Sequence, residues 1–169
     1  MGIYTFENKT PIIHGSTYVH PQATIIGDVE IAGDCFIGPG AVLRGDFDKI
    51  RIGPGTSIQD NCVIHVGFRE GVSIAGQVTI GHGAILHDVT IDYYVLIGMG
   101  SILMSGVTIE EHVMIAAGSV VKEDFHIPAG LLVAGNPARI VKALSEDQKK
   151  RIHQSLKTYQ ELAKRYQEP

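Results

Sequence analysis

Two histidines lie five positions apart in the stretch IGHGAILH, residues 80–87. No other ionisable side chain falls between them, and their neighbours are glycine, alanine or aliphatic residues. A gap of five fits neither one face of a helix, where residues three or four apart are neighbours, nor one face of a strand, where the period is two. Imidazole is a common metal ligand, so what His82 and His87 can do depends on the fold that positions them.

An aliphatic residue recurs every six positions along most of the chain. The series is Val19, Ile25, Ile31, Ile37, Leu43, then Ile52, Ile58, Ile64, then Ile74, Ile80, Leu86, and after a one-residue deletion Ile91, Ile97, Leu103, Ile109, Ile115 and Val121. A period of six predicts a short strand and a tight turn, repeated, with each coil burying its apolar residues on its neighbours. Cys35 and Cys62 occupy a second series of small residues, which predicts inert core thiols.

This pattern resembles the hexapeptide repeat of left-handed parallel β-helices, in which three hexads form one triangular coil. We therefore predict an all-β solenoid over residues 1–144, with irregular entry and exit segments at 1–18 and 126–144, and a C-terminal helix over 145–169. Ser145 and Gln148 form a Ser-x-x-Gln capping box at the start of that helix. Its apolar stripe is expected to pack on the prism or on a neighbouring subunit, and consists of Ile152, Leu156, Tyr159 and Tyr166.

The hexads place the histidines relative to one another. His65 and His87 each follow an aliphatic residue by one position and are three units, or one coil, apart, so they should stack in one column on the same face. Stacked strands lie ~4.8 Å apart, which allows two imidazoles to share a metal ion. His82 belongs to the column of Asp60 on the preceding face, and a symmetric assembly would bring it to the histidine pair of the next subunit.

The segments LRGDF, IQDNCV and IGHGAILH together resemble the γ-class carbonic anhydrases, and most closely the subgroup of phenylacetate-degradation and carnitine-operon hexapeptide proteins. The resemblance implies a homotrimer in which Zn, or Fe(II) or Co(II), is bound between subunits and a metal-bound hydroxide hydrates CO2 to bicarbonate. By resemblance, the metal ligands are His65, His82 and His87. The resemblance also implies that Gln59 orients the bound water or substrate. It implies an interface ion-pair network of Arg44, Asp46 and Asp60, although both aspartates also suit tight turns.

Departures from that family concern the movement of protons. Phe47 follows Asp46 where the best-characterised members carry an active-site glutamate, and the acidic loop that supplies their proton shuttle is shortened here to VGFREGVSIAGQ. Glu70 is the only carboxylate in this segment. Metal binding and rapid CO2 hydration are therefore separate expectations, and hydration is expected to be weak if no shuttle exists.

Three alternatives remain open from the sequence. Many hexapeptide proteins are CoA-dependent acetyltransferases, although these usually place a catalytic histidine on a long loop and need no metal triad. A metal-dependent acyl-CoA thioesterase and a non-catalytic metal-binding scaffold fit the same histidines. The other histidines match no family position and are interpreted as structural or solvated; these are His14, His20, His112, His126 and His153.

Composition excludes several partners and settings. The chain has 169 residues, a formal net charge of −4 and a pI near 6.0, with no cluster of Lys and Arg that would indicate a nucleic-acid surface. It has neither a run of 18 apolar residues nor the basic and apolar regions of a signal peptide. With only two cysteines, a disulfide framework is not expected, and a cytoplasmic location is predicted.

Overall fold

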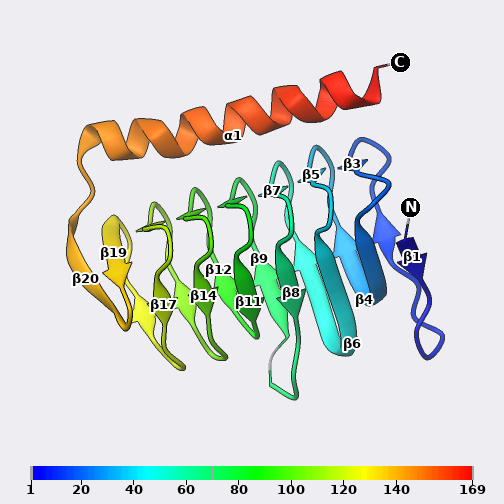
Figure 1. Cartoon of the computed structure of the whole chain (residues 1–169), viewed down its shortest axis with the longest axis horizontal. Coiled ribbons are helices and arrows are strands. Elements are labelled where there is room, and N and C mark those ends of the chain that lie inside the picture. Colours follow the sequence, from blue (N-terminus) through cyan, green and yellow to red (C-terminus); the bar gives the residue numbers. More distant parts are fainter. Residues whose placement is uncertain (1, 70, 169) are drawn as a thin grey trace.

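The aliphatic series forms the interior of a left-handed parallel β-helix of about 7 turns, with one helix lying along its length (Figure 1). The computed structural model describes residues 2–69 and 71–168. Residues of the series are at most 7% exposed, and the small-residue positions are equally buried, Cys35 and Cys62 among them. The predicted fold class is therefore confirmed, and both cysteines are free core thiols.

Each coil contributes one strand to each of three faces. The first face contains β1 (Gly2–Tyr4), the start of β4 (Thr24–Ile31), the start of β6 (Val42–Ile52), β8 (Val63–His65), β11 (Ile85–His87), β14 (Ile102–Leu103) and β17 (Val120–Val121). The second face contains β2 (Ile12–Ile13), the ends of β4 and β6, β9 (Val72–Ile74), β12 (Thr90–Ile91), β15 (Thr108–Ile109) and β18 (His126–Ile127). Since β4 and β6 bend around a corner, these two faces join into one 12-stranded sheet.

The third face is a separate 8-stranded sheet. It contains β3 (Tyr18–Val19), β5 (Phe36–Ile37), β7 (Ser57–Ile58), β10 (Thr79–Ile80), β13 (Leu96–Ile97), β16 (Met114–Ile115), β19 (Leu131–Gly135) and, antiparallel at its end, β20 (Ala138–Ala143). Every other pairing in this sheet is parallel and keeps the hexad register, so Ile58, Ile80 and Ile97 stack directly.

Helix α1 (Glu146–Gln167) covers the third face and runs back toward the N-terminal coils (Figure 1). The predicted capping box of Ser145 and Gln148 is present at its start. Ile152 and Leu156, on the side of α1 that faces the prism, are buried, and Tyr166 stacks on Tyr18 with ring centroids 4.9 Å apart. The apolar side of α1 thus packs on the prism of its own chain. No helix of the described residues is long and apolar enough to cross a membrane.

The first coil begins earlier than the sequence interpretation placed it. Residues 1–18 were expected to be irregular, yet β1 and β2 both pair with β4, and Ile3 and Ile13 continue the aliphatic columns next to Ile25 and Ile31. The insertion between these two short strands separates Ile3 from the six-residue series, whereas Ile13 lies six positions before Val19 and continues it.

The last coil likewise extends past Val121, where the sequence interpretation ended the repeat. Ile127 and Val133 keep the six-residue spacing and are both 0% exposed. The predicted exit segment over 126–144 is therefore a further coil, closed by the antiparallel strand β20. Pro128 and the apolar run after it hid this coil, because they disrupt the alternation expected of a short strand.

Candidate functional site

His65 and His87 occupy one column of the first face, as the hexad count predicted. Strand β11 pairs in parallel with β8 so that His87 lies opposite His65, and β6 places Arg44 opposite His65 one coil earlier. The two imidazole rings are 5.0 Å apart between centroids and meet edge to face. The main-chain ladder thus brings together two potential ligands that are 22 positions apart in the chain (87 minus 65).

His65 is held by an acidic neighbour. Its Nε2 lies 2.9 Å from Asp46 Oδ1, and Arg44 forms an ion pair with the other oxygen of the same carboxylate. Burial disfavours the charged form of Asp46, but the hydrogen bonds to His65 and Arg44 outweigh it and lower the pKa of Asp46 below its usual value. Arg44 and Asp46 thus pair within one chain, whereas the network that the resemblance implies across a subunit interface stays a prediction.

One phenylalanine contacts His65, and a second contacts the first. Phe47, at the position of the family's glutamate, lies edge-on to the His65 ring at 5.9 Å and contacts Phe68 at 4.5 Å between centroids. Phe68 is 88% exposed even though its ring contacts Phe47. Glu70, the carboxylate considered as a proton shuttle, lies outside the described residues. His65 therefore has the charged pair of Asp46 and Arg44 at its Nε2 atom and the apolar ring of Phe47 against its ring.

His87 is held by residues that the sequence interpretation did not single out. Its Nδ1 lies 2.9 Å from Ser105 Oγ and 3.3 Å from Asp88 Oδ2. The Asp88 side chain is only 3% exposed. Leu86 pairs with Leu103, which aligns Asp88 with Ser105 one coil later. Each of these two polar residues lies two positions after a core aliphatic residue, and this shared position in the repeat could have identified both from the sequence.

His82 lies at the corner between the third and first faces, away from the other two histidines. Its Nδ1 is 3.1 Å from Asp60 Oδ2, which confirms the predicted column, and its Nε2 is 3.4 Å from the hydroxyl of Tyr159 on α1. Gln59 is 5% exposed, and its Oε1 accepts the backbone N–H of His82 at 3.3 Å. Burial, and after it the nearby Asp60 charge, raise the pKa of Tyr159.

The glycines around His82 are required by the stacking of the coils. A Cβ on Gly81 would approach backbone atoms of the next coil to 2.8 Å, and Gly83 turns the corner at φ +69° and donates its N–H to Asp60 O at 2.9 Å. The composition of IGHGAILH thus follows from the tight corner that separates its two histidines.

Within one chain, the described residues contain no group of three His, Cys, Asp or Glu side chains that could hold a metal ion. His65 and His87 offer two imidazoles at one place, and His82 offers a third elsewhere. Imidazole donors suit Zn, Fe and Co. A three-histidine centre therefore needs a second copy of the chain.

An apolar stripe runs along the outer surface of the first face, between the corner of His82 and the column of His65 and His87. It consists of Val63, Ile85 and Ile102, which are 36%, 43% and 38% exposed. Parallel pairing places Val63 beside Ile85 and Ile85 beside Ile102. A contiguous row of half-exposed aliphatic residues is typical of a surface that contacts another protein.

The remaining histidines have local partners. His112 and His153 both contact the Tyr94 ring at 5.0 Å between centroids, and His126 pairs with Glu110 at 3.2 Å. None of these rings approaches the pair of His65 and His87 in the described contacts. Their interpretation as structural or solvated residues agrees with this placement.

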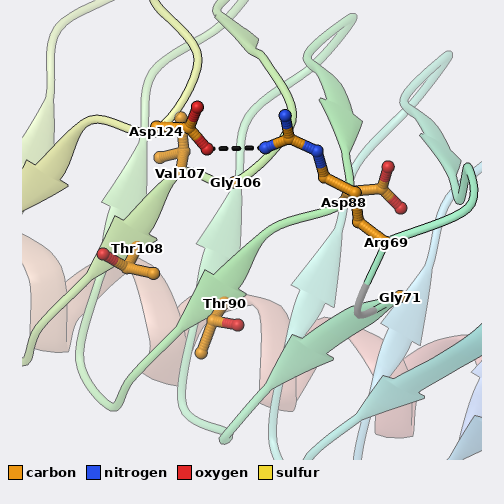
Figure 2. Close-up of a pocket in the computed structure, with 8 residues that line it drawn as sticks. All are labelled: Arg69, Gly71, Asp88, Thr90, Gly106, Val107, Thr108 and Asp124. Atoms are coloured by element: carbon orange, nitrogen blue, oxygen red, sulfur yellow. Dashed lines mark hydrogen bonds and ion pairs between the residues drawn. The ribbon is translucent and has the colours of Figure 1, made fainter.

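A polar pocket of about 410 Å³ borders the His87 environment (Figure 2). Asp88 lies at its edge, and Arg69 reaches across it to Asp124, with which it forms an ion pair at 2.6 Å. Thr90 and Thr108 line its other side. Asp88 therefore both lines this pocket and contacts His87.

Repeated coils with a buried aliphatic column at every face define a hexapeptide-repeat protein. The family model described as "Bacterial transferase hexapeptide (six repeats)" matches residues 10–45 and 88–123. The carnitine operon protein CaiE of Escherichia fergusonii is 42% identical over 166 residues, which cover 98% of this chain and 84% of the relative. CaiE of Escherichia coli O157:H7 is 41% identical over the same coverage. The chain belongs to the hexapeptide-repeat family, together with the CaiE proteins.

Solved structures agree over nearly the whole chain. A hexapeptide transferase family protein from Anaplasma phagocytophilum is 37% identical, with a TM-score of 0.93 and 98% of each chain covered. A Bacillus cereus protein provisionally called an acetyltransferase is 34% identical, with a TM-score of 0.94 over 97% of this chain and 95% of that one. These relatives share both the prism and its C-terminal helix.

Proposed function

We propose that the chain is a metal-dependent enzyme of the γ-carbonic anhydrase type that hydrates CO2 reversibly at sites shared between the subunits of a homotrimer. His65 and His87 of one copy and His82 of the next would hold Zn, or Fe(II) or Co(II). The observation that carries the proposal is the placement of His65 beside His87 in one column, with ring centroids 5.0 Å apart, while His82 lies at another corner. A divalent ion bound by three imidazoles supplies a Lewis acid that makes water nucleophilic at neutral pH.

The donor atoms of the pair fit this role with one rearrangement. Nδ1 of His87 is engaged by Ser105, which leaves Nε2 for a ligand. Nε2 of His65 contacts Asp46. For that nitrogen to bind an ion, Asp46 would turn toward Arg44, with which it already forms an ion pair.

The apolar stripe supports the assembly. Val63, Ile85 and Ile102 lie between the two parts of the proposed site, so a second copy that covers the stripe would carry its His82 toward His65 and His87. In a closed ring of three copies, the same contact would repeat at each interface and create three equivalent sites.

Other side chains have roles in the proposed reaction. Gln59 uses its carbonyl oxygen to hold the His82 backbone, so its amide N–H groups can donate to substrate or water. Phe47 and Phe68 would shield the site from bulk water. Because Phe47 replaces the family's glutamate, we expect proton release to limit turnover.

Acyl transfer from an acyl-CoA is the second candidate. The names of the relatives favour it, since the Anaplasma protein is called a hexapeptide transferase and the Bacillus protein an acetyltransferase. The histidines favour the first candidate, since they lie on the coils themselves and not on a long loop, with His65 and His87 in one register. Two other functions would use the same histidines: metal-dependent hydrolysis of an acyl-CoA thioester, and metal binding without catalysis. The experiment below distinguishes both from the two candidates.

That experiment compares the wild-type protein with His87→Ala and with the control His126→Ala, whose exposed side chain contacts Glu110 and Thr108. Bound metal, CO2 hydration by stopped flow, and hydrolysis and transfer of acetyl-CoA are measured on each. We expect metal and hydration in the wild type and in the control, and loss of both in His87→Ala. A metal-loaded trimer without hydration would refute the carbonic anhydrase proposal, and acetyl transfer without metal would establish the second candidate.

A further inference from the structure

Asp88 is a buried carboxylate next to the proposed metal ligand His87. Its side chain is 3% exposed, and its backbone adopts a left-handed conformation with φ 47°. Oδ1 accepts the N–H of Gly67 at 2.8 Å, and Oδ2 lies 3.4 Å from Ser105 Oγ and 3.3 Å from His87 Nδ1. Burial of a carboxylate is costly unless hydrogen bonds satisfy it, so these three contacts account for its position.

The contacts indicate where the proton of a neutral His87 lies. An ionised carboxylate only accepts hydrogen bonds, so the Ser105 hydroxyl donates its proton to Asp88. The same hydroxyl then presents a lone pair to His87 Nδ1 at 2.9 Å. Both the hydroxyl and the carboxylate therefore require a hydrogen on Nδ1, which leaves Nε2 with a free lone pair.

We propose that Asp88, directly and through Ser105, is a positioning residue that keeps His87 in its Nδ1–H form and aims Nε2 as the electron-pair donor of the site. The Asp88 carboxylate also accepts the N–H of Gly67 and thereby positions the loop that carries Phe68. That Nε2 binds a metal ion rests on the proposed function, whereas the protonation pattern of the ring does not.

The substitution Asp88→Asn tests this inference with little disturbance of the fold. Asparagine tolerates the left-handed backbone at this position, and its carbonyl oxygen can still accept the N–H of Gly67. Its amide group donates, however, where the Asp88 Oδ2 atom accepts. The Ser105 hydroxyl loses its acceptor, and the hydrogen of His87 should move from Nδ1 to Nε2.

The primary measurement is the long-range 1H–15N NMR spectrum of metal-free, full-length protein with 15N-labelled histidine, recorded at pH 8, where imidazoles are mostly neutral. We expect the Nδ1–H form of His87 in the wild type and a shift toward the Nε2–H form in Asp88→Asn. Asp124→Asn is the matched control, since Asp124 lines the same pocket and contacts Arg69 instead. Circular dichroism and melting temperature establish that each variant is folded.

A second variant and a second measurement separate the outcomes. Ser105→Ala removes the intermediate hydroxyl but keeps the direct contact with Asp88, so the Nδ1–H form should persist there and be lost in the double variant with Asp88→Asn. Zn²⁺ affinity should fall about 10–100-fold in Asp88→Asn and remain unchanged in Asp124→Asn. An Nε2–H form in the wild type, or an Nδ1–H form in the double variant, overturns the inference. Absence of Zn²⁺ binding in wild type, with the expected NMR pattern, overturns the proposed function alone.

Discussion

The substitution Ile85→Glu tests whether the apolar stripe holds copies of the chain together. Ile85 lies at the centre of this stripe, between Val63 and Ile102, and no metal ligand or core residue is altered by the change. If the site is shared between copies, a carboxylate here should separate the copies and so abolish metal binding, although the substitution changes no proposed metal ligand. Ile140→Glu is the matched control, because Ile140 is 47% exposed on β20, compared with 43% for Ile85, and lies off the stripe.

The expected effect follows from the exposed fractions. Complete burial of an aliphatic side chain contributes about 1.5–3 kcal/mol, so covering the exposed 43% of Ile85 contributes about 1 kcal/mol at each interface. An unpaired carboxylate in the same place costs several kcal/mol of desolvation. Because the proposed trimer would repeat the contact three times, the variant should lose on the order of 10 kcal/mol of assembly free energy.

Light scattering after size-exclusion chromatography measures the oligomeric state, and elemental analysis of the same fractions measures bound metal. We expect a trimer with metal for the wild type and for Ile140→Glu, and a metal-poor monomer with an intact β-helix for Ile85→Glu. A trimeric, metal-loaded Ile85→Glu protein would refute the role assigned to the stripe. Equal dissociation of both variants would show that the effect is a general consequence of the added charges.

Three further predictions concern the stability of the coil stack and its helix. Leu86→Ala removes a side chain that is 0% exposed and lies between Ile64 and Leu103. The substitution should lower the free energy of unfolding, measured by urea titration, by about 2–5 kcal/mol, and a loss below about 1 kcal/mol would show that the column is not close-packed. Burial raises the pKa of Cys62 from 9.0 to about 11, so the stability gained by keeping this thiol protonated is complete below pH 9 and is lost as the pH rises toward 11. That loss, ~2–3 kcal/mol, should appear in wild-type unfolding curves and be absent from Cys62→Ala. Ser145→Ala removes the N-cap of α1 and should cost about 0.5–2 kcal/mol in thermal unfolding, and an unchanged midpoint would mean that the cap is dispensable.

The register of the candidate site residues could be predicted because the main-chain ladder of a β-helix is strictly periodic. Once three hexads are taken as one coil, the placement of His65 beside His87, and of Asp60 beside His82, follows by counting. The same logic failed at both ends of the prism. At the N-terminal end a loop between β1 and β2 takes Ile3 out of phase, while at the C-terminal end Ile127 and Val133 keep the spacing but a proline follows Ile127.

Side-chain directions within a column could not be predicted in this way. Counting does not reveal that Asp46 turns toward Nε2 of His65, or that Ser105 and Asp88 engage Nδ1 of His87. These choices depend on rotamers and on hydrogen bonds between coils, which the hexad pattern leaves open. Tyr159 is a similar case, since its helical spacing indicated only an apolar stripe, while packing of α1 on the third face brings its hydroxyl to His82.

The amino-acid sequence by itself determined the fold, the core columns and the column that each histidine occupies, because all three depend on a periodic main chain whose repeat is written in residue types. Only the tertiary structure decided which atoms of those histidines are engaged and which remain available, because that depends on contacts between residues about one coil apart. For IGHGAILH, the sequence determined that His82 and His87 occupy different columns. The structure showed that Asp60 holds one and Asp88 with Ser105 the other.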